Sequence, residues 1–172
     1  MMFKRQSGAG QSEPDRNDGI SAITFYGNWI VNADTKTGFL ATGLTVLGAA
    51  AFTQLRRFIS TAPFSGWRDL FAGLLVSVAL AGIASGAVFV VSAIIPRTGA
   101  PAGFSRYAYP SLAIQPQGFV PALDAEEQRK EAWVQARALS LIAIKKFTYF
   151  RRGLFAFVLS APILGIATIL IR

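Results

Sequence analysis

Long uncharged stretches alternate with polar segments along this chain, and they predict three membrane-spanning helices. The stretches 38–55, 70–95 and 154–171 contain 18, 26 and 18 residues without Asp, Glu, Lys or Arg. A hydrocarbon core of about 30 Å needs roughly 20 helical residues, so the second stretch is ample and the other two lie near the lower limit. The pattern therefore predicts an all-α integral membrane protein with three transmembrane helices.

Helical patterns also precede the first and the third span. Residues 20–57 contain no proline, so the first span is expected to be the second half of one long helix. Asp124 and Glu127 have the spacing of a capping box, and an amphipathic helix over 124–153 is expected to lead into the third span. These extensions of the first and third helices are expected to form a small cytoplasmic head.

The remaining segments do not have helical patterns. Residues 1–19 are polar, rich in Gly and Ser and without the apolar region of a signal peptide, which predicts a disordered tail. Five of the eight prolines lie within 96–123, so this segment cannot be a regular helix. It is either a mobile linker or an ordered loop packed on the rest.

The distribution of Lys and Arg predicts the orientation. With the N-terminus in the cytoplasm, thirteen of the seventeen cations fall on the cytoplasmic side. Cytoplasmic loops carry the excess of Lys and Arg in membrane proteins, so the C-terminus is expected on the opposite side. The thirteen are Lys4, Arg5, Arg16, Lys36, Arg97, Arg106, Arg129, Lys130, Arg137, Lys145, Lys146, Arg151 and Arg152.

Composition narrows the chemistry. The chain has no Cys and no His, and its nine carboxylates form no pattern of a metal cage or an acid–base pair. We therefore expect no enzymatic activity, no cofactor and no metal. The net charge of +8 has two compatible interpretations: charges that flank membrane spans, or a site for an anionic ligand or lipid. A nucleic-acid partner is not expected.

Charged residues stand directly before the first and the third span. Asp34 and Lys36 are two residues apart on a helix, so they point to different sides and cannot pair with each other. A carboxylate at the membrane edge needs a cation, and Asp34 is expected to lie near Lys145, Lys146 or Arg151. These charges are otherwise ordinary interfacial residues.

Small residues recur four apart in the second span, a pattern that permits close helix approach in lipid. The helix could use them within the chain or against another copy, and we expect a homo-oligomer. The candidate packing residues are Gly73, Ser77, Ala81, Gly82, Ser85 and Gly86.

Two segments carry a resemblance to a known family. ADTKTGFLATGLTVL, with Ala33, Asp34 and Lys36, and ALSLIAIKKFTYFRRGLF, with Ser140 and Lys146, resemble the two signature segments of the Pycsar transmembrane effector family. The order of the segments and their placement before the first and last spans also agree with that family.

The resemblance implies an anti-phage effector of the bacterial inner membrane. Such an effector binds a cyclic pyrimidine nucleotide, cCMP or cUMP, on its cytoplasmic side and then impairs the membrane. The alternatives are a membrane scaffold or assembly subunit without a nucleotide ligand, and a small channel or transporter component. The expected ligand-binding residues are Asp34, Lys36, Ser140, Lys145, Lys146, Tyr149, Arg151 and Arg152.

Overall fold

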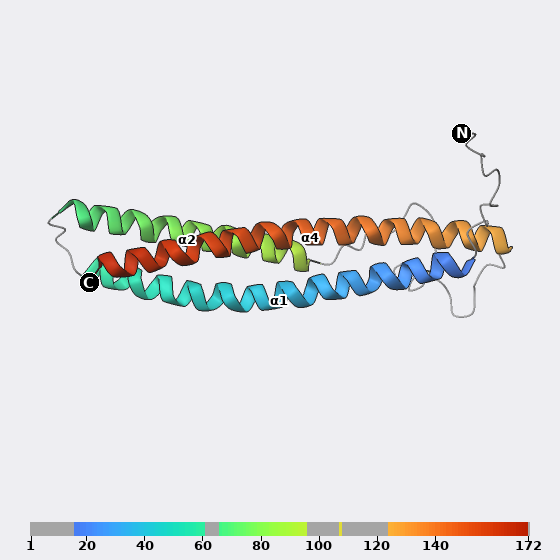
Figure 1. Cartoon of the computed structure of the whole chain (residues 1–172), viewed down its shortest axis with the longest axis horizontal. Coiled ribbons are helices and arrows are strands. Elements are labelled where there is room, and N and C mark those ends of the chain that lie inside the picture. The colour runs from blue at the N-terminus through green and yellow to red at the C-terminus, as the bar shows by residue number, and fades with distance from the viewer. Residues whose placement is uncertain (1–15, 61–65, 96–106, 108–123, 172) are drawn as a thin grey trace, which may run out of the picture. The chain divides into compact units, whose positions relative to one another are not determined.

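The computed structural model describes residues 16–60, 66–95, 107 and 124–171. These ranges contain three helices: α1 (Arg16–Ser60), α2 (Trp67–Ile94) and α4 (Ala125–Leu170) (Figure 1). All three are long and apolar enough to cross a membrane, and the described ranges contain no strand. The expected all-α fold with three spanning helices is confirmed.

The helix bounds differ from the sequence pattern at several ends. Residues 16–19 belong to α1, although the pattern placed them in the polar tail. α1 continues to Ser60, α2 begins at Trp67, and α4 runs through Pro162 as a single helix. Residues 1–15, and the 96–123 segment apart from Tyr107, lie outside the described part of the chain.

The chain divides into two compact units, and α1 and α4 contribute to both. Unit 1 comprises Met1–Asn28 and Thr98–Leu141, and unit 2 comprises Trp29–Arg97 and Ile142–Arg172. Unit 2 contains the three predicted spans, whereas unit 1 contains the beginnings of α1 and α4.

In unit 1, the two helix beginnings approach each other closely at Gly19. A Cβ atom at Gly19 would lie 2.9 Å from Cβ of Ala132, which is completely buried. This contact gives the first turn of α1 a packing partner, which explains why the helix starts before Ile20 in spite of a glycine.

Polar contacts fix the first turns of α4. The backbone N–H of Glu127 donates to Oδ1 of Asp124 at 2.7 Å, as expected for an N-cap. The Lys130 side chain donates to Glu126 one turn earlier, and this hydrogen bond holds the pKa of the Glu126 carboxyl below its usual value.

In unit 2, the three helices form one bundle with an apolar interior. All three helices meet at Gly153 of α4, where an added Cβ would lie 3.2 Å from Leu40 of α1 and 3.5 Å from the Gly86 carbonyl of α2. Glycine at these positions lets the backbones approach, as in other membrane bundles. The buried core consists of Leu40, Leu44, Ala51, Ala79, Ile83, Val90 and Leu164.

The outer faces of the bundle are apolar as well. Phe39 is 75% exposed and Ile169 68% exposed, and many other large apolar side chains of unit 2 are exposed. A soluble monomer rarely exposes apolar surface on this scale, whereas lipid chains cover it readily. The exposed apolar faces therefore agree with a bundle that sits in a bilayer.

Candidate functional site

An ion pair joins α1 to α4 at the level where both helices approach their uncharged stretches. The ammonium group of Lys146 donates a hydrogen bond to Oδ1 of Asp34, across 112 positions of sequence. The Lys146 side chain is only 7% exposed, whereas that of Asp34 is 46% exposed. The expectation that Asp34 lies near one of the cations of α4 is confirmed, and Lys146 is that cation.

Short buried side chains precede or follow this pair within one turn of each helix. Ala33 and Thr37 lie one turn apart on the buried face of α1, and Ala143 lies one turn before Lys146 on α4. The hydroxyl of Thr37 donates to the Ala33 carbonyl at 2.7 Å, so its burial leaves no polar group unsatisfied. Small residues at these positions let the helices approach closely, which leaves Lys146 buried between them.

An aromatic contact adjoins the ion pair, and the sequence alone does not identify it. The rings of Trp29 and Phe147 meet edge to face, with centroids 5.4 Å apart and an interplanar angle of 65°. Phe147 directly follows Lys146, and Trp29 precedes Asp34 by five residues. Such aromatic pairs add to the stability of helix contacts, so this contact supports the same junction of α1 and α4.

The other predicted cations are exposed. Lys145, Arg151 and Arg152 on α4 all have exposed side chains. Lys145 and Arg152 are seven residues apart, which places them on one face of α4 with about 10 Å between them along the axis. They can reach an anion from outside the bundle, whereas Lys146 is held by Asp34.

Two further predicted ligand-binding residues are partly buried. The Ser140 hydroxyl donates to the Arg137 carbonyl of its own helix at 2.8 Å. Tyr149 on α4 is also half-buried. Of the eight predicted ligand-binding residues, the structure joins Asp34 and Lys146 by a direct hydrogen bond and places the others along the same two helices.

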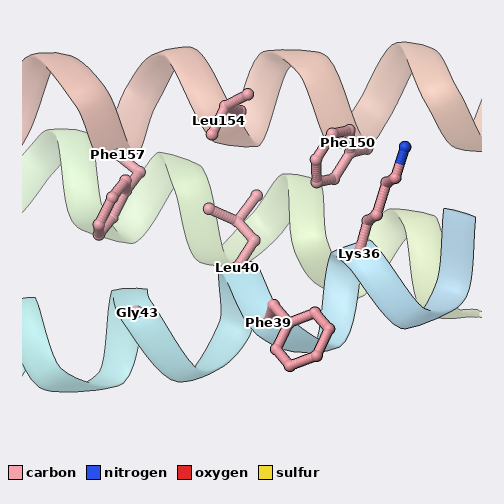
Figure 2. Close-up of a pocket in the computed structure, with 7 residues that line it drawn as sticks. All are labelled: Lys36, Phe39, Leu40, Gly43, Phe150, Leu154 and Phe157. Atoms are coloured by element: carbon pink, nitrogen blue, oxygen red, sulfur yellow. The ribbon is translucent and has the colours of Figure 1, made fainter.

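Lys36 lies at a different feature, an apolar groove between α1 and α4. The groove has a volume of about 320 Å³, and its walls are apolar apart from Lys36 (Figure 2). Its components are far apart in the sequence, so no local motif reveals it. The residues that line it are Lys36, Phe39, Leu40, Gly43, Phe150, Leu154 and Phe157.

The small residues of α2 separate into two sets. Gly73, Gly82 and Gly86 contact other helices of the same chain: an added Cβ would lie 2.5 Å from the Phe58 ring, 2.2 Å from Ser160 Oγ and 3.0 Å from Leu44, respectively. These glycines therefore serve packing within the chain, one of the two uses that the pattern allows.

The second set faces outward. Ser77, Ala81 and Ser85 are exposed, and both hydroxyls donate to carbonyls of their own helix one turn earlier. Their hydrogen-bonding capacity is thus partly met without a partner. Contact with another copy through these residues remains a prediction.

Comparison with known protein families identifies a matching family model. The family model described as the Pycsar effector protein domain matches residues 21–171, which is most of the chain. No curated protein and no solved structure matches it. The resemblance based on the segments around Asp34 and Lys146 is thus confirmed.

Proposed function

Because this chain belongs to the Pycsar effector protein domain family, which implies an anti-phage membrane effector, we propose that it binds a cyclic pyrimidine nucleotide and then impairs the membrane. The match over residues 21–171 is the observation that carries the proposal. The family is not a known enzyme family, so the proposed activity is a ligand-dependent change of the membrane and not a reaction on the nucleotide.

The exposed cations of α4 support binding of an anion. A cyclic mononucleotide carries one phosphodiester charge, and a charge-assisted hydrogen bond from Lys or Arg is about twice as strong as a neutral one. Lys145 and Arg152 share an exposed face, and Arg151 lies beside it. We assign the phosphate to this group in preference to Lys146, whose ammonium already donates to Asp34.

The charge distribution supports a cytoplasmic site. The proposed phosphate-binding cations belong to the cation-rich side of the chain, which the positive-inside rule places in the cytoplasm. A nucleotide made in the cytoplasm reaches this side without crossing the membrane. The inner membrane is the location that fits both features.

The exposed apolar faces support an effect on the bilayer. Large apolar side chains such as Phe39 on α1 and Phe155 on α4 are exposed on a single bundle, and a surrounding bilayer would cover them with lipid. Rearrangement or self-association of the helices after ligand binding would change how these faces meet lipid. Impairment of the membrane then follows from a shift between two arrangements of the helices.

Leakage from liposomes tests the proposal. Purified full-length protein in dye-loaded liposomes should release dye when cCMP or cUMP is added, and not with cAMP or cGMP. Arg152→Gln and Lys145→Gln should each raise the half-maximal nucleotide concentration about tenfold, because one charge-assisted hydrogen bond is worth roughly 1.5–3 kcal/mol.

A matched control variant removes one positive charge at a position far along α1 from the proposed phosphate site. Arg57→Gln removes an exposed cation from the other end of α1, and its response to nucleotide should equal that of the unmodified protein. Leakage that is the same with all four nucleotides, together with no binding by calorimetry, would favour a membrane scaffold without a nucleotide ligand.

A further inference from the structure

We propose that the groove between α1 and α4 is a site for an anionic phospholipid, with an acyl chain against its apolar walls and the phosphate at Lys36. The proposal is independent of nucleotide binding. It rests on the shape of the groove, on the single cation at its end and on its position along the predicted spans.

The apolar part of the groove suits a hydrocarbon chain. Its walls are three phenylalanine rings, two leucine side chains and the bare backbone at Gly43, around a volume of about 320 Å³. This volume lies at the lower end of the range for small-molecule sites. Figure 2 shows the rings of Phe150 and Phe157 on α4 above the α1 turns that carry Phe39 and Gly43.

Gly43 keeps the groove open at its deeper end. An added Cβ at this position would lie 3.3 Å from the Phe157 ring, so any side chain here would press on that ring and occupy part of the groove. The absence of a side chain at Gly43 thus preserves space next to Phe157.

The polar end of the groove is a single uncompensated cation. Lys36 is exposed, and within the described ranges no carboxylate pairs with it. The nearest carboxylate in the sequence, that of Asp34, instead accepts the hydrogen bond from Lys146. In Figure 2, the Lys36 side chain extends from α1 at the end of the groove where Phe150 lies. A phosphate at this end would complement its charge.

The polar and apolar ends of the groove are arranged along the membrane depth in the same order as the headgroup and acyl chains of a phospholipid. Lys36 is the last charged residue before the uncharged stretch 38–55, so it marks the headgroup level. Gly43 is seven residues further along α1, about 10 Å deeper at 1.5 Å per residue. The lining therefore changes from cationic to apolar over the depth at which a phospholipid changes from phosphate to acyl chain.

The charge at Lys36 decides which lipid the groove prefers. An acyl chain gains little by leaving other acyl chains for an apolar groove, because both surroundings are equally apolar. Lys36 attracts the headgroup of an anionic lipid more strongly than that of a zwitterionic lipid. One cation near anionic lipid contributes about a fivefold preference for the anionic over the zwitterionic lipid. The occupant is therefore an anionic phospholipid.

Electron paramagnetic resonance of spin-labelled lipids tests the site without nucleotide. Full-length protein is reconstituted in phosphatidylcholine vesicles that contain a trace of chain-labelled phosphatidylglycerol or phosphatidylcholine. The motionally restricted fraction should be higher for phosphatidylglycerol, in line with a preference of about fivefold at the site. Lys36→Gln should abolish this preference, whereas Arg57→Gln, with the same change of charge, should keep it.

A second pair of variants tests the groove itself. Leu154→Trp fills the groove and should lower the restricted fraction of phosphatidylglycerol, whereas Leu159→Trp, at an exposed position of α4 outside the groove, should not. If Leu154→Trp does not fold, Phe39→Ala serves in its place, because it removes an exposed wall.

Three results would overturn the proposal. The first is an equal loss of preference in Arg57→Gln, which would indicate general attraction of anionic lipid. The second is a restricted fraction of phosphatidylglycerol that stays the same in both Leu154→Trp and Phe39→Ala. The third is a restricted fraction that falls as the chains dimerise, which would assign the groove to a second copy. None of these results bears on nucleotide binding, since no nucleotide is present.

Discussion

Lys146 on α4 donates a hydrogen bond to Asp34 on α1, and the cation of this pair is buried while the carboxylate is half exposed. The two ends of the pair therefore have different access to water. Loss of the carboxylate leaves a buried ammonium group without an anion, whereas loss of the ammonium group leaves a carboxylate that water can reach.

This asymmetry predicts unequal costs of substitution. Asp34→Ala should lower the free energy of unfolding by about 3–5 kcal/mol, because it leaves a buried ammonium group without an anion. Lys146→Met keeps the apolar stem and should cost less. The double variant Asp34→Ala/Lys146→Met should be more stable than Asp34→Ala alone. Unfolding by SDS in mixed micelles measures all three, and a costlier Lys146→Met would contradict the prediction.

The contact between Gly82 and Ser160 predicts a compensating pair. Gly82→Ala places a Cβ 2.2 Å from Oγ of Ser160, which is 2% exposed and donates to the Ala156 carbonyl. Overpacking of this kind costs about 1–3 kcal/mol. Addition of Ser160→Ala removes the clashing oxygen and leaves Ser160 Cβ at 3.5 Å as the nearest contact from α4.

The same unfolding assay should show recovery in the double variant to the level of Ser160→Ala alone. Gly165→Ala is the control, because an added Cβ there meets nothing within 4 Å. It should leave stability unchanged or raise it by up to about 1 kcal/mol through helix propensity. Equal destabilisation by both alanines would show that Gly82 is not a point of close approach.

The outward-facing small residues of α2 predict self-association on one face. The chain has no cysteine, so a single introduced cysteine reports contacts between copies by disulfide formation. Ala81→Cys and Ser85→Cys should form oxidised dimers in membranes more readily than Ala87→Cys, which is also exposed but on another side of the helix. Equal crosslinking at all three positions would indicate random collision.

The distribution of cations predicts the topology. A reporter fused after Arg172 should be periplasmic, and one inserted within 105–120 should be cytoplasmic, because thirteen of the seventeen cations then lie inside. Alkaline phosphatase and green fluorescent protein fusions measure the two locations. A cytoplasmic C-terminus would contradict three complete spans.

The unfolding and crosslinking measurements test contacts and exposed faces of the helices. The topology measurement tests whether the proposed nucleotide site lies in the cytoplasm.

The sequence by itself determined the fold class and the family. An uncharged stretch of 18 residues or more can enter a bilayer, where a helix pairs all of its backbone N–H and C=O groups internally. Three such stretches therefore predict three spanning helices. The segments around Asp34 and Lys146 are local in the sequence, and the family match confirms the resemblance that they indicate. The need of Asp34 for a cation also follows from charge alone.

Only the tertiary structure decided which side chains meet. Lys145 and Lys146 are neighbours about 100° apart around α4, and the rotation of α4 against α1 buries one and exposes the other. Similarly, the rotation of α2 against α4 turns Gly82 toward Ser160 and leaves Ser85 exposed. The start of α1 at Arg16 and the groove at Lys36 likewise depend on contacts between residues more than 100 positions apart, which no local pattern contains.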